Sequence, residues 1–281
     1  MSMEIVLRRA RPADREAVLL VERKSMPTLQ YLPSMFEEFM QDDVGDFSVE
    51  EVDGVIAACG KYTIVPDGSV WLETLRVTPE RQGIGLGKRL YEHWHELAKA
   101  QGVRAMRMYT GVFNAVSSGL AERYGLRLQG TFNGYSLRVQ PGMGSRGGFR
   151  PVRDPEEATR LLMPIAEAWG GWMVMNRTFY RLGPELCAYL TSREMVYKEL
   201  GTSSVIALGA RFMSWQALHV GAWGGDANAC LNFALWLAGE RSVPVINCLH
   251  ESSSPGISDV LSRHGFKPDS TQYVVKGIDL S

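Results

Sequence analysis

The sequence predicts an α/β (α+β) protein built from two domains of similar fold, in which helices flank a sheet. Two observations support this prediction. Each half of the 281-residue chain alternates strand-like apolar runs with amphipathic helical runs. Between the halves, the stretch 140–148 holds four glycines and one proline without apolar periodicity, which is typical of a linker. We therefore expect one domain at 1–139, a linker at 140–148 and a second domain at 149–281.

The two halves begin and end alike. Asp14 follows Arg-Pro-Ala and Asp154 follows Arg-Pro-Val-Arg, and each precedes an amphipathic run, so we expect each Asp to cap a helix. Near the ends, Tyr-Gly-Leu-Arg around Gly125 parallels His-Gly-Phe-Lys around Gly265. A glycine is expected where a helix stops, and a strand-like run follows each one. These parallels favour a tandem repeat over two unrelated α/β domains.

The middle of each half repeats one pattern with little sequence identity. A strand leads into a glycine-bearing turn, an amphipathic helix and another strand. The expected elements are strands at 69–78 and 103–110 around a helix at 87–102, and strands at 214–223 and 243–249 around a helix at 227–240.

Composition excludes several classes of protein. The 30 Lys and Arg residues are balanced by 31 Asp and Glu, so a broad nucleic-acid-binding surface is not expected. The most apolar segment, 229–238, is about half the length that a membrane span needs. The first residues are charged and lack the apolar core of a signal peptide. We therefore expect a cytoplasmic protein that binds neither nucleic acid nor membrane.

No metal or disulfide is expected. The four cysteines, at positions 59, 187, 230 and 248, are widely spaced and form no Cys-x-x-Cys pair. His93 and His95 stand two apart on a predicted helix and point to different faces, so they are poor joint ligands.

The most informative segment is a glycine loop. A strand runs into Pro79, and Gly83, Gly85 and Gly87 then open a helix. Backbone N–H groups at a helix N-terminus form an anion site when no side chain obstructs them, and phosphate is the natural guest. The P-loop fails because Lys88 is followed by Arg, and the dinucleotide fingerprint fails because Lys88 stands where its third glycine belongs. What remains is Gln-x-x-Gly-x-Gly, beginning at Gln82, after a Val-x-Pro strand end.

That pattern, with the order of strand, loop, helix and strand and then Asn114, resembles the GNAT (GCN5-related) N-acetyltransferases. The resemblance covers the first half and implies tandem GNAT-like domains, each a mixed, mostly antiparallel sheet flanked by helices, the second one degenerate. In Tyr31-Leu32-Pro33, Glu73-x-Leu75-Arg76-Val77 and 273–279, the whole chain also resembles the histidine N-acetyltransferase-like proteins.

The resemblance implies acetyl-CoA as co-substrate and no metal. It implies acetyl transfer to a primary amine of a small molecule, for instance an amino acid such as histidine, by direct attack in a ternary complex. Protein N-termini and aminoglycosides remain open as acceptors. A non-catalytic CoA-binding sensory module is the rival class, and the oligomeric state stays open. The implied cofactor-binding residues are Leu75, Arg76, Val77, Gln82, Gly83, Ile84, Gly85, Leu86, Gly87, Lys88 and Asn114.

The catalytic assignments follow from the same resemblance. The Leu75 N–H would polarise the thioester, and Glu73 would be the base or bind the substrate cation, since strand alternation puts both side chains on one face. The alternative is that Glu73 pairs with an Arg. Tyr31, with Glu37 or Glu38, would bind the acceptor. The family's usual acid position is Ala121 here, so Tyr124 is the candidate acid, with a packing role as the alternative.

The second half replaces the glycine loop with Gly-Gly-Asp-Ala-Asn, where Asp226 stands at the expected helix start. A carboxylate there satisfies the same N–H groups and repels an anion. We therefore predict that this half binds no CoA and serves as a structural element or as a wall of the acceptor site.

Overall fold

The computed structural model describes residues 3–28 and 30–280, which form two compact units. Unit 1 comprises Met1–Met108, Asn114–Arg127 and Lys276–Ser281. Unit 2 comprises Tyr109–Phe113 and Leu128–Val275. The stretch 140–148, expected to be a linker, lies inside unit 2 and forms neither helix nor strand.

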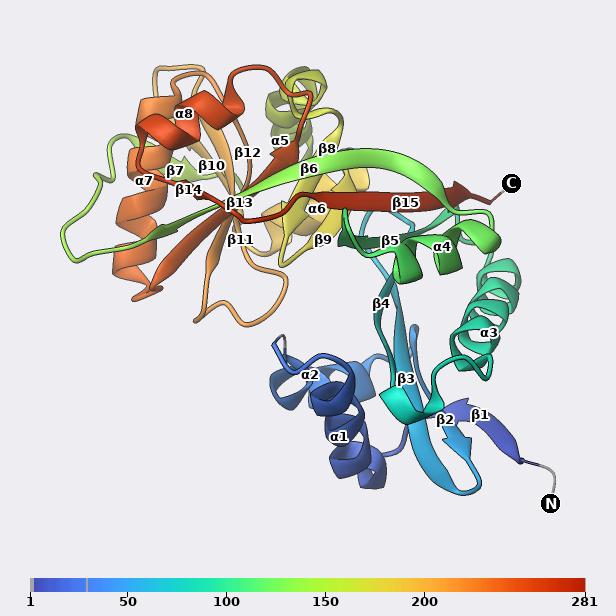
Figure 1. Cartoon of the computed structure of the whole chain (residues 1–281). Coiled ribbons are helices and arrows are strands. Elements are labelled where there is room, and N and C mark those ends of the chain that lie inside the picture. Colours follow the sequence, from blue (N-terminus) through green and yellow to red (C-terminus); the bar gives the residue numbers. More distant parts are fainter. Residues whose placement is uncertain (1–2, 29, 281) are drawn as a thin grey trace. The chain divides into compact units, whose positions relative to one another are not determined.

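Unit 1 is built on an antiparallel sheet to which one parallel strand is added (Figure 1). Asp53 and Gly54, both at positive φ, make the tight turn of its first hairpin, as Asp-Gly pairs commonly do. The strands run in the order β1 (Ile5–Arg9), β2 (Asp46–Val52), β3 (Val55–Ile64), β4 (Val70–Val77), β5 (Ala105–Gly111) and β15 (Tyr273–Asp279). β5 is parallel to β4 because a helix connects them.

Helices cover both faces of this sheet. On one face, α1 (Arg15–Ser25) lies against β3 and β4, and α2 (Leu32–Gln41) lies against β2. On the other face, α3 (Leu86–Gln101) packs on β3 and β4, and α4 (Ala115–Arg123) follows β5 (Figure 1). The core beneath α3 contains residues of α3 and of strands β3, β4 and β5, among them Tyr62, Leu72, Leu90, Trp94 and Met106. Two short 3-10 turns, η1 (Pro12–Asp14) and η2 (Pro79–Arg81), precede α1 and α3.

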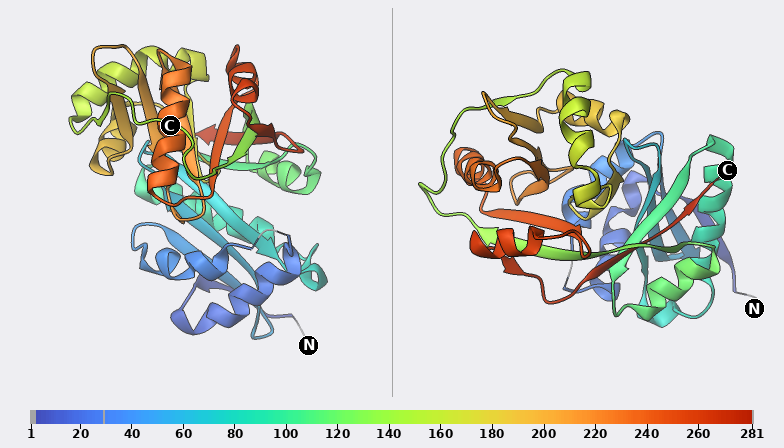
Figure 2. Two further views of the ribbon diagram at one scale, coloured as in Figure 1. Left: turned by 90° about the vertical axis from the view of Figure 1, so that its left-hand side faces the viewer. Right: turned by 90° about the horizontal axis from the view of Figure 1, so that it is seen from above.

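Unit 2 repeats this plan. Its sheet runs β6 (Arg127–Arg138), β13 (Val245–Glu251), β12 (Leu218–Gly224), β11 (Val205–Gly209), β10 (Val196–Glu199) and β7 (Phe149–Pro151), and β14 (Lys267–Pro268) pairs with β6. β12 and β13 are parallel and are joined by α7 (Ala227–Glu240), which lies against β11, β12 and β13 (Figure 2). The remaining elements are α5 (Pro155–Leu162), η3 (Met163–Ile165), η4 (Glu167–Trp169), the hairpin β8 (Trp172–Met175) and β9 (Thr178–Arg181), α6 (Pro184–Ser192) and α8 (Ile257–Arg263).

The last strand of each half belongs to the unit built mainly from the other half. Residues 128–138, which follow α4, are part of unit 2, and Lys276–Ser281, which follow α8, are part of unit 1. Inside unit 1 the Leu280 N–H donates to the Arg104 carbonyl at 2.8 Å, and Lys276 pairs with Glu122. The domain boundaries expected from the sequence, 1–139 and 149–281, stay a prediction. The two compact units have other boundaries, because each unit includes an end segment of the other half.

The fold class predicted from the sequence is confirmed, with two local corrections. The strand expected at 214–223 begins only at Leu218, because 214–217 form a turn. Asp14 does not cap α1 through its side chain; its carboxylate accepts instead from Arg8 and from the Arg11 N–H. Asp154 does cap α5, accepting from two backbone N–H groups. Gly125 and Gly265, both at φ 83°, follow α4 and α8 as predicted.

No described helix is long and apolar enough to cross a membrane.

Candidate active site

The glycine loop of unit 1 forms a helix start that only glycine can adopt without strain. The chain leaves β4 at Val77, makes the turn η2, and enters α3 at Leu86. Gly83 has φ 83° and Gly85, the N-cap residue, has φ 98°. A Cβ at either position would meet nothing within 4 Å, so the requirement is conformational rather than steric.

The N-terminus of α3 has no side-chain cap. Gly85 offers none, and no acidic residue stands in the first turn. The Gly85 carbonyl accepts from the N–H groups of Lys88 and Arg89, at 3.0 and 3.2 Å. The N–H groups that precede them at the helix start have no intrahelical acceptor, and together with the helix dipole they suit an anion. The loop therefore fits the pyrophosphate of a CoA ester.

A β-bulge interrupts β4 directly before the loop. Lys61 pairs with Glu73 and Cys59 pairs with Arg76, so two residues of β4, 74 and 75, oppose Gly60 alone. Thr74 accommodates the extra residue at φ 54°, which is uncommon for a branched side chain. Such bulges re-aim the side chains that follow them.

The bulge overturns the expectation that Glu73 and Leu75 share one face. Leu75 packs against the core beneath α3, and its Cδ2 would lie 3.7 Å from a Cβ on Gly87. Glu73 instead shares a face with Lys61, its partner on β3. The extra residue shifts the alternation by one position, so the two side chains point to opposite faces.

Glu73 lies in a polar setting on the face covered by α1 and α2. Its side chain is buried, with 9% exposure, and accepts a hydrogen bond from the Thr63 hydroxyl at 2.7 Å. The ammonium of buried Lys61 pairs with Asp42, close to the end of α2, and donates to the Tyr62 carbonyl at 2.9 Å. The surroundings of Glu73 therefore include a hydroxyl donor and a fixed ammonium on the neighbouring strand.

Asn114 and Tyr124 have clear structural roles. Asn114 caps α4, its Oδ1 accepting from the Ser117 N–H at 3.1 Å. Tyr124 stacks on Tyr91, with ring centroids 5.1 Å apart, and its hydroxyl donates to Glu92 at 2.9 Å. Burial and that carboxylate raise the pKa of Tyr124 to about 12.

These contacts hold the Tyr124 hydroxyl beside the second turn of α3. Glu92 stands seven residues beyond Gly85, which corresponds to about 10 Å along a helix. Ala121, at the family's usual acid position, is fully buried. The packing role proposed as the alternative for Tyr124 is consistent with its contacts with Tyr91 and Glu92.

Tyr31 is the N-cap residue of α2, and its ring meets Phe39 edge-on at 6.5 Å. Its backbone N–H donates to Glu22 of α1 at 3.2 Å. Sequence reasoning missed Glu22, which is fully buried between Val18 and the sheet face covered by α1. A signal was present, since an acidic residue stands four positions after Val18 on the apolar stripe of a predicted helix. Glu37 pairs with Arg15 at 3.6 Å on the surface, and Glu38 is exposed.

Unit 2 has a corresponding bulge, but there a side chain caps the helix that follows. In β12, Val220 pairs with Leu208 and Ala222 with Ala207, which leaves Gly221 as the extra residue. Asp226 caps α7, its Oδ1 accepting from the N–H groups of Asn228 and Ala229 at 2.8 and 3.3 Å. The cap predicted from the sequence is thus present.

In β12, the strand before α7, a backbone carbonyl accepts a hydrogen bond from a side chain of the same unit. The Trp169 indole N–H donates to the Trp223 carbonyl at 3.0 Å, and the two rings meet edge-on at 4.7 Å. The Trp223 carbonyl thus already accepts one hydrogen bond from a side chain of the protein itself.

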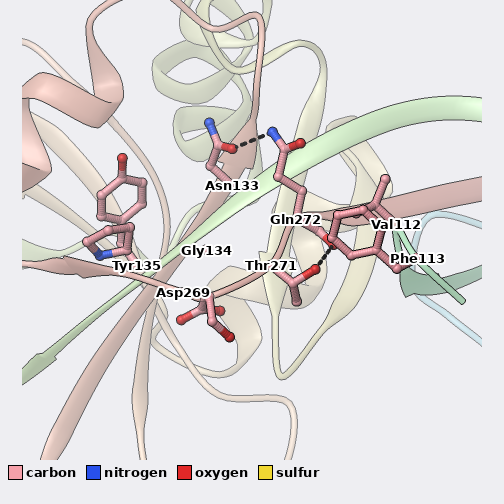
Figure 3. A pocket seen from close by; sticks show the side chains of 10 residues that line it. Val112, Phe113, Asn133, Gly134, Tyr135, Asp269, Thr271 and Gln272 are labelled. Atoms are coloured by element: carbon pink, nitrogen blue, oxygen red, sulfur yellow. Dashed lines mark hydrogen bonds between the residues drawn. The ribbon is translucent and has the colours of Figure 1, made fainter.

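A cavity of about 300 Å³ lies in unit 2 and is lined by residues of 112–113, 133–135 and 268–272, none of which is a predicted site residue (Figure 3). Gln272 Nε2 donates to the side-chain Oδ1 of Asn133 at 2.9 Å on one wall, and Asp269, on another, accepts from the Tyr273 hydroxyl at 2.8 Å. Val112 and Phe113 add an apolar rim. No Lys or Arg is among the residues that line this cavity.

Within residues 3–28 and 30–280, no group of three or more potential ligands could hold a metal ion. His93 contacts Asp46 at 3.1 Å, and His95 contacts the Tyr124 carbonyl. All four cysteines are free and buried, and burial raises the pKa of the Cys59 thiol to about 12.

Residues 16–126 match the model of the acetyltransferase (GNAT) family. A Bacillus subtilis protein named as a ribosomal protein bS18-alanine N-acetyltransferase is 25% identical over 136 residues, which are 48% of this chain and 89% of that protein. An amino-acid acetyltransferase of Ralstonia nicotianae is 35% identical over 72 residues, which are 25% of this chain and only 16% of that protein.

Two solved structures share the fold along nearly the whole chain. A GCN5-related N-acetyltransferase from Sphaerobacter thermophilus has a TM-score of 0.66 and 16% identity, covering 98% of this chain and 95% of that one. A tandem GNAT protein from the clavulanic acid biosynthesis pathway has a TM-score of 0.62 and 14% identity, covering 99% and 98%. At these identities the likeness shows the fold alone. The resemblance to histidine N-acetyltransferase-like proteins stays a prediction.

Proposed function

Residues 16–126 match the acetyltransferase (GNAT) family, and on that premise we propose that unit 1 transfers an acetyl group from acetyl-CoA to the primary amine of a small molecule. The observation that carries this proposal is the uncapped start of α3 directly after the bulged strand β4. The first N–H groups of a helix have no intrahelical acceptor and need one from outside the helix. A pyrophosphate supplies such an acceptor.

The cofactor-binding residues would divide into two groups. Gln82, Gly83, Ile84, Gly85, Leu86, Gly87 and Lys88 would hold the pyrophosphate, chiefly through backbone N–H groups. Leu75, Arg76 and Val77 would align the acyl-pantetheine arm by backbone hydrogen bonds. The Asn114 oxygen is used as a helix cap, so its contribution would come through the amide N–H groups.

The chemistry requires an aligned thioester, a stabilised oxyanion and a neutral amine. The amine nitrogen attacks the thioester carbonyl carbon, so that a C–N bond forms and the C–S bond breaks. The Leu75 N–H would stabilise the oxygen that becomes negative. Glu73 would take the proton of the ammonium, directly or through water, and the CoA thiolate would gain a proton from water.

The opposite orientation of the Glu73 and Leu75 side chains does not prevent this chemistry. A backbone N–H of a strand lies near the plane of the sheet, whereas the side chains stand above and below it. A thioester at the edge of β4 would thus accept its hydrogen bond from an N–H in the plane of the sheet. The amine would approach it from the face on which Glu73 lies. That face is the one covered by α1 and α2, which carry Tyr31.

We further propose that unit 2 binds no acetyl-CoA. The Asp226 carboxylate occupies the N–H groups of α7, and the Trp169 indole occupies the Trp223 carbonyl. An incoming pyrophosphate would have to displace a carboxylate and then face its charge.

The acceptor we favour is a free amino acid or a similar small amine. The amino-acid acetyltransferase among the relatives supports this choice, although it shares only a quarter of this chain. The relative named for an alanine N-acetyltransferase supports an α-amino group, and leaves a protein N-terminus as the competing acceptor.

The test is an acetyl-CoA turnover assay that detects free CoA thiol with a panel of amino acids, amines and N-terminal peptides. Replacing Glu73 by Gln should lower kcat by about 100-fold, the usual scale for a lost general base. The matched control is Glu16→Gln, an exposed carboxylate on α1 that has no proposed role in the site. Binding of acetyl-CoA without thiol release on any acceptor would instead identify a non-catalytic module. Undiminished kcat in Glu73→Gln would remove the proposed base.

A further inference from the structure

Glu22 is a buried carboxylate that the proposed chemistry does not use. It lies on α1 and has no measurable exposure, among the apolar residues Val18, Leu19 and Val21. Burial raises its pKa, because a charged carboxylate loses its hydration there. A buried acidic group of this kind is expected to be fully hydrogen-bonded.

Its hydrogen bonds all go to the start of another helix. Glu22 Oε1 accepts from the Tyr31 and Leu32 N–H groups at 3.2 and 3.3 Å, and Oε2 accepts from the Leu32 N–H at 3.2 Å. Tyr31 is the N-cap residue of α2 and Leu32 is the first residue of the helix. The Tyr31 side chain makes no cap bond. α2 is therefore capped by a carboxylate from α1, ten residues earlier in the chain.

Glu22 also interacts with the bulged strand. The positive charge of Arg76 lowers the pKa of Glu22 and so opposes the effect of burial. Arg76 Nη1 donates in turn to the Leu75 carbonyl at 3.2 Å, and Arg76 Nε has no partner among the described residues. One carboxylate thus bonds to the start of α2, and the helix that carries it, α1, lies against β4.

We propose that Glu22 is a positioning residue for the acceptor side of the acetyltransferase site. It fixes the N-terminus of α2, and with it Tyr31, at a set distance from the Leu75–Arg76 segment. The amine acceptor would then meet a preformed surface on the face of Glu73. This inference rests on the proposed function and adds the element that holds the acceptor side in place.

A purely structural cap and a positioning residue differ in which kinetic constant they change. The N–H groups of the glycine loop and those of α2 belong to different helices, so loss of Glu22 should leave the cofactor loop intact. The acceptor KM should rise while the affinity for acetyl-CoA stays the same. A general loss of folding would weaken both together.

The test compares Glu22→Ala and Glu22→Gln in the full chain. Glu22→Ala leaves two N–H groups without an acceptor and should raise the acceptor KM about tenfold. The acetyl-CoA Kd, measured by calorimetry, should change less than about twofold, because no cofactor donor is lost. Glu22→Gln keeps one carbonyl acceptor and should recover most of the effect. Glu16→Ala, on the exposed face of the same helix, is the matched control.

Amide hydrogen exchange supplies a readout that does not depend on turnover. In Glu22→Ala the Tyr31 and Leu32 amides should exchange about tenfold faster than in the wild type, with the α3 amides unchanged. Unchanged exchange at Leu32, an unchanged acceptor KM, or a parallel rise in acceptor KM and acetyl-CoA Kd would each overturn the proposal. If the wild type acetylates no acceptor, the proposed function fails, and exchange at Leu32 with calorimetry still decides the role of Glu22.

Discussion

A buried carboxylate next to α3 should make the stability of unit 1 depend on pH. Glu50 on β2 is fully buried, and its Oε1 accepts from Arg89 Nε at 3.2 Å. Its Oε2 has no partner among the described residues. Burial raises the pKa of Glu50 to about 7; the Arg89 charge opposes this shift, and Glu92 adds to it.

The sign follows from the direction of the shift. Since the pKa is raised from 4.5 in the unfolded chain to about 7, the folded state favours the protonated carboxyl. The resulting stability is fully present below the unfolded value and is lost as the pH rises through about 7. A shift of about 2.5 units corresponds to roughly 3.4 kcal/mol at 1.36 kcal/mol per unit. About three quarters of it should be lost between about pH 5 and pH 8.

The perturbation is Glu50→Gln, which keeps the shape and cannot ionise. Relative to the wild type, its free energy of unfolding should rise by about 2 to 3 kcal/mol between about pH 5 and pH 8. Urea denaturation followed by tryptophan fluorescence measures this difference. Glu96→Gln, an exposed carboxylate on α3, is the control and should show no such trend. A difference between Glu50→Gln and the wild type that is constant across this range, or that shrinks with rising pH, would refute the reasoning.

Three further predictions concern the site. Gly85→Ala places a side chain on a residue at φ 98°, which costs about 1–2 kcal/mol. Its affinity for acetyl-CoA, measured by calorimetry, should be about tenfold weaker. The control Gly119→Ala on α4 should leave this affinity unchanged. Tyr124→Phe should lower the unfolding free energy by about 1 kcal/mol and change kcat less than threefold; a loss of about 100-fold would restore it as the acid. Asp226→Ala should lower the free energy of unfolding by about 1 kcal/mol in a thermal or urea melt, because α7 loses its cap. The variant should still bind one acetyl-CoA per chain. A second bound acetyl-CoA would instead show that the Asp226 carboxylate alone excludes the ligand from unit 2.

Features that depend on neighbouring residues were predictable from the sequence. The loop at Gly83 and Gly85 was found because alternating glycines before an amphipathic run have few structural uses, and the positive φ angles agree with that interpretation. The carboxylate of Asp226 at the start of α7 was found for the same reason, since a cap acts within three residues of itself.

Features that depend on distant residues were missed or misjudged. The prediction that the side chains of Glu73 and Leu75 lie on one face was wrong. A bulge separates them, and it depends on the pairing of β4 with β3, where Gly60 opposes two residues. Tyr124 stays a prediction as the acid, and its contacts with Tyr91 and Glu92 on α3 were not foreseen. None of these contacts has a signature in the spacing of residues along the chain.

By itself the sequence determined the fold class, the repeated plan of the two halves and the glycine-rich, uncapped start of one helix. Each of these follows from local rules: the period of apolar residues, the conformational freedom of glycine and the reach of a capping side chain. Tertiary structure alone decided which face Glu73 occupies, that Glu22 caps α2 and that the last strand of each half joins the other unit. The physical reason is that strand register and buried charge are settled by partners far away in the chain, whose contributions only folding brings together.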